Sequence, residues 1–124
     1  DYQYNWLGWY GTNMEVVVDL GKDTTIRQIS TGFLEDQRHW AFLPGEVRYS
    51  ISADGLEFTE LSRLAGEPLY ENYEKSVKEY QVELPAGTIA RYVKVTAKNI
   101  GIPPEWRFYK GRKAWLFADE IMIK

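Results

Sequence analysis

The chain has 124 residues, which is the size of one ordinary domain. Its 15 Lys and Arg stand against 18 Asp and Glu, and the net charge of −3 argues against nucleic acid as a partner. The lack of Cys excludes thiol catalysis and Cys-ligated metal sites, and no apolar run is long enough for a membrane span, so we expect no membrane insertion. Aromatic residues make up 15% of the chain, which indicates that some rings face a ligand.

Apolar and polar residues alternate along most of the chain, and this period of two predicts β-strands. The predicted strands cover 14–20, 26–34, 46–52, 58–64, 79–84, 89–97 and 114–123. The pair Asp54-Gly55 predicts a tight turn that joins the third and fourth strands as a hairpin. The last strand is apolar on both faces except at Asp119 and Glu120, as expected of a central strand that is covered on both sides.

Seven short strands separated by turn signals predict an all-β fold, an antiparallel β-sandwich. Three long connections, at 1–13, 35–45 and 99–113, carry large or polar side chains, and the segment 69–77 is interpreted as a loop or a single turn. The side chains predicted to be buried are Val47, Tyr49, Ile51, Tyr80, Val82, Leu84, Val93, Val95, Trp115 and Phe117.

The connection after the second strand holds the only His of the chain together with carboxylates and a guanidinium. Such groups form hydrogen bonds with a polar ligand, while an aromatic ring beside them covers its apolar side. This loop is therefore a candidate binding loop. The alternative is a solvated loop, and Trp40 and Phe42 are expected to turn inward as its anchor.

The last long connection carries a second candidate site. Two prolines stiffen its start, so that Trp106, Phe108 or Tyr109 could form a stacking face at modest entropic cost. The alternative is that one of these rings plugs the end of the sandwich.

Asp119 and Glu120 interrupt an apolar strand, where charges are costly unless they are paired or bind a metal ion. Glu120 is therefore predicted to be buried and either metal-bound or paired with an Arg or Lys. No Ser-His signature and no patterned pair of carboxylates accompanies these residues, so the chain is predicted not to be an enzyme.

Five motifs resemble, in order and spacing, the discoidin or coagulation factor V/VIII type C superfamily. The greatest similarity is to galactose-binding-like carbohydrate-binding modules appended to bacterial glycoside hydrolases. The motifs are Trp6-Leu-Gly-Trp-Tyr-Gly11, Val17-Val-Asp-Leu-Gly21, Tyr49-Ser-Ile-Ser-Ala-Asp-Gly55, Ala90-Arg-Tyr-Val-Lys-Val95 and Ala114-Trp-Leu-Phe-Ala-Asp-Glu-Ile121.

The resemblance implies a jelly-roll sandwich without catalytic machinery, in which loops at one end bind a glycan of the galactose or N-acetylhexosamine type. It assigns hydrogen-bonding roles to Glu35, Arg38 and His39, and a stacking role to an aromatic residue of the last long loop. It also implies a structural calcium ion held by the Asp119-Glu120 pair and backbone oxygens, as suits a cation that takes six to eight oxygen ligands.

Such modules usually begin with a further strand, so 1–124 is expected to be a single domain that lacks this strand and is a piece of a longer polypeptide. The expected role is to target a covalently linked glycoside hydrolase to its substrate, in a secreted, periplasmic or cell-surface protein of a bacterium. Two alternatives stay open. One is a structural spacer that packs on a neighbouring catalytic domain, and the other is adhesion to lipid or protein at a cell surface.

Overall fold

The computed structural model describes residues 2–102 and 112–124, and for 2–6 it describes the backbone alone. The described residues form eight strands and one short 3₁₀ helix, η1 (Gln37–His39). The strands are β1 (Tyr2–Tyr10), β2 (Met14–Thr25), β3 (Gln28–Glu35), β4 (Glu46–Ser52), β5 (Thr59–Ala65), β6 (Ser76–Glu83), β7 (Ile89–Ala97) and β8 (Trp115–Ile123). Among these elements, no helix has the length and apolar character needed to cross a membrane.

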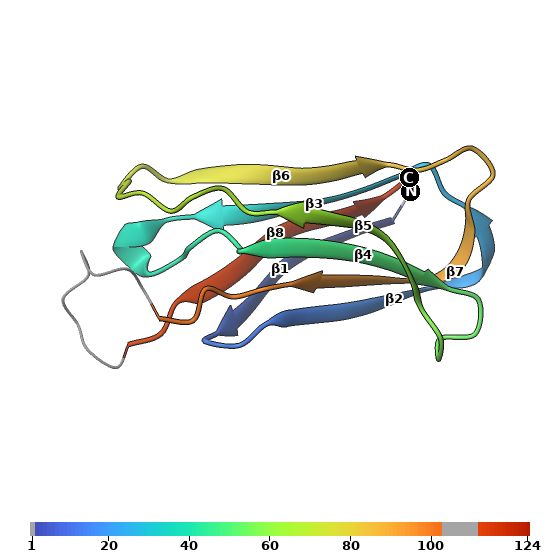
Figure 1. Cartoon of the computed structure of the whole chain (residues 1–124), viewed down its shortest axis with the longest axis horizontal. Coiled ribbons are helices and arrows are strands. Elements are labelled where there is room, and N and C mark those ends of the chain that lie inside the picture. Colours follow the sequence, from blue (N-terminus) through green and yellow to red (C-terminus); the bar gives the residue numbers. More distant parts are fainter. Residues whose placement is uncertain (1, 103–111) are drawn as a thin grey trace.

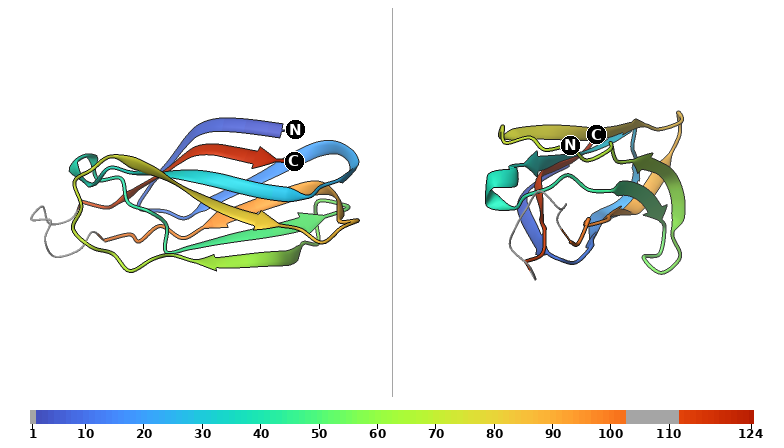
Figure 2. Two further views of the ribbon diagram at one scale, coloured as in Figure 1. Left: turned by 90° about the horizontal axis from the view of Figure 1, so that it is seen from above. Right: turned by 60° about the vertical axis from the view of Figure 1, so that its left-hand side comes forward.

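The strands form two antiparallel sheets that pack face to face, with the orders β1-β8-β3-β6 and β2-β7-β4-β5 (Figures 1 and 2). Consecutive strands lie in different sheets except for the β4–β5 hairpin, which is the arrangement of a jelly-roll sandwich and confirms the predicted fold class. Tyr2 pairs with Ile123, so the two ends of the chain lie together at one end of the sandwich.

All seven predicted strands are present, but the interpretation of 1–13 as a long connection is wrong. Tyr2–Tyr10 forms β1 and pairs along β8. Gly8 weakens the strand signal because glycine packs poorly in a sheet. In the fold this glycine lies beneath the ring of Phe117, where an added β-carbon would be 2.6 Å from the ring edge. The neighbouring strand thus supplies the packing that the residue itself lacks.

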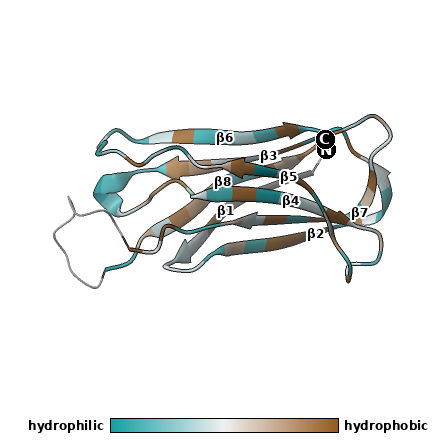
Figure 3. Cartoon of the chain, viewed as in Figure 1, coloured by the Kyte–Doolittle hydropathy of each residue, from teal (hydrophilic) through white to brown (hydrophobic). Residues whose placement is uncertain are grey.

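The core lies between the sheets, and five of the ten side chains predicted to be buried are buried in it. Val47, Tyr49, Val93 and Val95 are fully buried, and Tyr80 is 4% exposed. Ile51, Val82 and Leu84 are half-buried and pack against this core. In Figure 3 hydrophobic colouring runs along strands of both sheets, whereas η1 is hydrophilic.

The burial predicted for Trp115 and Phe117 is wrong. Leu116 and Ala118 face the core, so Trp115 and Phe117 lie on the outer face of the sheet and are half-buried. Their rings stack at 5.1 Å with an interplanar angle of 12°, and Tyr10 contacts Trp115 at the same centroid distance. A strand that is apolar on both faces gives no alternation, so the inward face could not be chosen from the sequence.

A buried tyrosine joins the two sheets. The hydroxyl of Tyr49 on β4 donates to the carbonyl oxygen of Tyr80 on β6 at 2.6 Å and lies 2.8 Å from the hydroxyl of Thr31 on β3. Burial raises the pKa of Tyr49 well above its ordinary value. The ring of Tyr80 is buried in the same layer, yet its hydroxyl has no hydrogen-bond partner among the described residues. The two tyrosines therefore form a natural comparison.

We expect Tyr49→Phe to destabilise the fold by about 1–2 kcal/mol, because it leaves the Thr31 hydroxyl and the Tyr80 carbonyl without this partner. Thermal unfolding is then expected about 5 °C lower than for the unchanged chain. Tyr80→Phe is the matched control, since it removes a hydroxyl that makes no hydrogen bond to the described residues, and it is expected to leave Tm unchanged or raised. Equal losses in the two variants would contradict this assignment.

Candidate functional site

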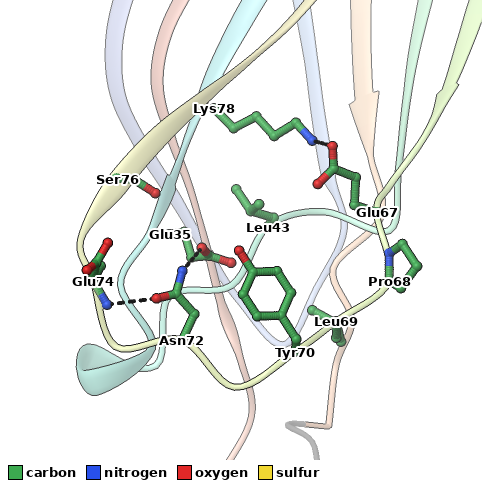
Figure 4. Close-up of a pocket in the computed structure, with 10 residues that line it drawn as sticks. All are labelled: Glu35, Leu43, Glu67, Pro68, Leu69, Tyr70, Asn72, Glu74, Ser76 and Lys78. Atoms are coloured by element: carbon green, nitrogen blue, oxygen red, sulfur yellow. Dashed lines mark hydrogen bonds and ion pairs between the residues drawn. The ribbon is translucent and has the colours of Figure 1, made fainter.

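Two long connections lie at the end of the sandwich opposite to the chain termini (Figure 1). One is the 36–45 loop between β3 and β4, which contains η1, and the other is the 66–75 loop between β5 and β6. They enclose a pocket of about 290 Å³ (Figure 4). Its lining residues are Glu35, Leu43, Glu67, Pro68, Leu69, Tyr70, Asn72, Glu74, Ser76 and Lys78.

The 36–45 loop is held by backbone hydrogen bonds and two buried rings. The N–H groups of Asp36 and Ala41 each donate to the other residue's carbonyl, at 2.9 and 3.0 Å. Trp40 adopts a left-handed conformation with φ of 65°, and the N–H of Trp115 donates to its carbonyl at 2.8 Å. Trp40 and Phe42 are buried, which confirms their predicted role as anchors.

Gln37 connects the two loops. Its side chain is completely buried, and its amide nitrogen donates to the carbonyl oxygen of Tyr70 at 3.0 Å. Its amide oxygen accepts from the backbone N–H of Asn72 at 3.2 Å. A buried amide with both ends satisfied by one partner loop fixes the position of that loop. Gln37 therefore sets the shape of the pocket from behind its wall.

Polar and aromatic side chains meet inside the pocket. Glu35 is 6% exposed as a residue, and its carboxylate accepts from the amide nitrogen of Asn72 at 3.0 Å. Lys78 pairs with Glu67 on the opposite wall. Figure 4 shows the ring of Tyr70 turned into the pocket, with its hydroxyl toward Glu35. The pocket thus offers hydrogen-bonding groups of both kinds beside an aromatic ring.

The candidate residues of the 36–45 region do not all reach this pocket. Glu35, at the end of β3, lines it, whereas Arg38 and His39 on η1 are exposed at the same end of the molecule and are absent from its lining. The Nδ1 atom of His39 lies 2.8 Å from the Oδ2 atom of Asp36, and the His39 side chain is 80% exposed. The candidate stacking residues Trp106, Phe108 and Tyr109 lie outside the described residues.

The contribution of the 66–75 loop was not foreseen from the sequence. The apolar spacing over 69–77 is helix-like but short and follows Pro68, so the sequence predicts only a loop or a single turn there. One signal was present: Leu69 and Tyr70 are large side chains within a polar segment, and both are exposed in the fold and line the pocket. An exposed ring beside a pocket indicates a binding surface more often than a packing role.

Asp119 and Glu120 lie on the outer face of the first sheet, where a bulge leaves Asp119 unpaired between Ala118 and Glu120. Both are half-buried, so the predicted burial of Glu120 is wrong, and no ion pair between described residues includes either one.

Within 2–102 and 112–124, no group of three or more His, Asp or Glu side chains is placed to hold a metal ion. Two carboxylates alone do not meet the six to eight oxygens that calcium takes. Calcium binding therefore stays a prediction. If the ion is bound, excess chelator is expected to lower Tm. An unchanged Tm would show that the fold does not depend on calcium.

Glu79 faces these two carboxylates and is expected to destabilise the fold at neutral pH. Its pKa is raised, first by burial and then by the negative charges of Glu120 and Asp119. The folded state therefore binds this proton more tightly than the unfolded state, so stability is gained as the pH falls through the raised pKa and lost as the pH rises. We expect Glu79→Gln to raise Tm slightly at pH 7 and to change it little at pH 4, measured by thermal unfolding. An equal gain at both pH values would contradict the assignment.

Two solved structures share similarity with the chain. One is CpGH89CBM32-5 from Clostridium perfringens, in complex with GalNAc-β-1,3-galactose, at 16% identity and a TM-score of 0.46. The other is the C-terminal domain of a chitobiase from Bacteroides fragilis, at 17% identity and a TM-score of 0.42. The similar regions cover 87% and 90% of this chain, and 64% and 65% of those chains.

A comparison with curated proteins finds no match. The model of the F5/8 type C domain matches residues 1–120, nearly the whole length of the sequence. Domains of this type are typically non-catalytic binding modules, which agrees with the predicted lack of an enzymatic role. With 120 of its 124 residues matched, the chain belongs to the F5/8 type C domain family.

Proposed function

We propose that this domain binds a glycan in the pocket between the 36–45 and 66–75 loops. The observation that carries the proposal is that the buried Glu35 carboxylate and the Tyr70 ring line one open pocket. A sugar presents hydroxyl groups at its edge and C–H groups on its faces, so it needs a polar group and a ring at the same place. Family membership supports a binding role of this kind.

The affinity of such a site is expected to be modest. One ring and a few hydrogen bonds around a single sugar unit correspond to dissociation constants of roughly millimolar to micromolar, or about −4 to −8 kcal/mol. Binding at this strength suits a module that keeps a covalently linked glycoside hydrolase near its substrate, in a secreted or surface-attached protein. We propose this targeting role for the longer polypeptide.

A glycan array on the 124-residue chain, followed by calorimetry on the sugars it retains, tests the proposal. Tyr70→Ala removes an exposed ring without opening the core and is expected to weaken binding about tenfold with little change in Tm. Tyr92→Ala is unsuitable as a control because its ring covers Gly55. Tyr73→Ala is suitable, since Tyr73 is exposed and outside the pocket lining.

Arg38→Ala and His39→Ala test whether η1 also contacts the glycan. Losing a charged hydrogen bond to a sugar hydroxyl costs about 1.5–3 kcal/mol, which is a large share of the affinity of a weak binder. If these variants bind normally while Tyr70→Ala does not, the glycan lies in the pocket alone. If no glycan is retained by the unchanged chain, the proposed function is wrong.

A further inference from the structure

The pocket carries an excess of negative charge. Its lining holds three carboxylates, those of Glu35, Glu67 and Glu74, and one ammonium group, that of Lys78. Lys78 is already paired with Glu67, so this pair is neutral as a unit. None of the ion pairs formed by described residues includes Glu35 or Glu74. Two negative charges of the lining are therefore left without a cation in the described part of the chain.

Glu35 is the more informative of these two residues because it is buried. Its side chain meets a neutral donor, the Asn72 amide at 3.0 Å, while only 6% of the residue is exposed. A buried carboxylate is costly unless a cation accompanies it, since a neutral hydrogen bond offsets only part of the lost hydration. A cationic ligand would supply the missing charge at the pocket wall.

A second buried polar group lies beside the same charges. The hydroxyl of Tyr80 makes no hydrogen bond to any described residue, although it is shielded from solvent. The Nζ atom of Lys78, a lining residue, lies 5.6 Å from the centre of its ring. Burial and the negative charges of Glu67 and Glu35 raise the pKa of Tyr80 to about 12. Tyr80 belongs to the core and does not line the pocket, so its raised pKa adds only that negative charge gathers on this side of the core.

We propose that the pocket prefers sugars that carry a free, protonated amino group, that is, 2-amino-2-deoxyhexose units rather than their N-acetylated or neutral counterparts. This inference rests on the proposed glycan-binding function and names its substrate class. The Tyr70 ring suits the C–H face of a sugar, and the ammonium group complements the Glu35 carboxylate. At about 290 Å³ the pocket is at the small end of ligand sites, which suits one sugar unit.

Matched pairs of monosaccharides test the preference, because members of a pair differ only in N-acetylation. Calorimetric titration of the 124-residue chain at pH 6 and low salt compares galactosamine with N-acetylgalactosamine and glucosamine with N-acetylglucosamine. Galactose serves as the neutral probe. In at least one pair we expect the free amine to bind about tenfold more tightly, and the difference to shrink in high salt and at a pH where the amine is neutral. Equal or weaker binding of both amines would overturn the inference.

Glu35→Gln removes the buried charge and keeps an oxygen for the Asn72 amide. We expect it to lower the affinity for the amine about tenfold and to change the affinity for the neutral sugar much less. Glu74→Gln provides a second test at an exposed lining residue if the buried substitution harms folding. Glu71→Gln, exposed and outside the lining, is the matched control and is expected to change nothing.

The outcomes separate the two proposals. Binding of N-acetylated or neutral sugars without a preference for amines leaves the glycan-binding function intact and overturns the substrate class. An amine preference that survives both Glu35→Gln and Glu74→Gln also overturns the assignment to this pocket. If no sugar of the panel binds and the glycan array retains nothing, the proposed function is wrong and the inference fails with it. Binding of an array glycan without binding of any panel sugar overturns the inference alone.

Discussion

Gln37→Ala is expected to abolish glycan binding and to destabilise the fold by about 2–4 kcal/mol. The substitution removes the only side chain that hydrogen-bonds to the backbone of both Tyr70 and Asn72 within the described residues. It leaves a carbonyl and an N–H group of the 66–75 loop without these partners, and it opens a cavity where a fully buried amide was packed. The loop that carries Tyr70 then loses its defined position.

Thermal unfolding and calorimetric titration of the same variant measure the two effects. Gln81→Ala is the matched control, because Gln81 is exposed on β6 and, among the described residues, its amide donates only to the exposed Glu83. The control is expected to change Tm and affinity little. If Gln37→Ala bound glycan normally, the 66–75 loop would not need this connection, and its place in the site would be wrong.

Gly66→Ala is expected to displace the 66–75 loop by a different route. The N–H of Gly66 donates to the carbonyl of Gly45 at 2.9 Å, so the two loop ends lie in direct contact. A β-carbon on Gly66 would meet the carbonyl oxygens of Pro44 and Gly45, the latter at 2.9 Å. Backbone atoms cannot rotate away as a side chain can, so the loops must separate. The cost is expected to be about 1–3 kcal/mol, with loss of the pocket.

Gly45→Ala is the control for this prediction. Gly45 lies across from Gly66, yet an added β-carbon there meets no atom within 4 Å, and its φ is not positive. The same substitution on the two sides of one contact is therefore expected to lower Tm and glycan affinity at Gly66 and to leave both nearly unchanged at Gly45. A Tm for Gly66→Ala equal to that of Gly45→Ala would contradict the packing described for the loop ends.

Strand positions could be predicted from the sequence because alternation reports burial on one face. This worked for β7, predicted and found at Ile89–Ala97, where Val93 and Val95 alternate with Lys94 and Thr96. Prediction from alternation failed where contacts with a neighbouring strand determine whether a segment forms a strand. Gly8 joins β1 because Phe117 covers it, and a ring that is 109 positions away in sequence leaves no local signal.

Only part of the candidate site could be predicted from the sequence, because the rest depends on contacts between segments that are distant in the chain. Glu35 was a candidate because a carboxylate, a guanidinium and an imidazole stand together in one segment. Its neighbours in the pocket come from the 66–75 loop, which reaches it through the side chain of Gln37. Gln37 is a polar residue between charged ones and has the pattern of a solvated loop, so only the tertiary packing shows that it is buried.

The central claim is that a glycan binds in the pocket between the 36–45 and 66–75 loops. Titration of the isotope-labelled chain with galactosamine, N-acetylgalactosamine and galactose, followed by backbone amide chemical shifts, tests it most directly. The account predicts saturable changes at Gln37, Tyr70 and Asn72, and none at the far end around Gly55. Saturable changes confined to the backbone amides of Tyr10 and Trp115, on the outer face of the first sheet, or no change with any sugar, would contradict it.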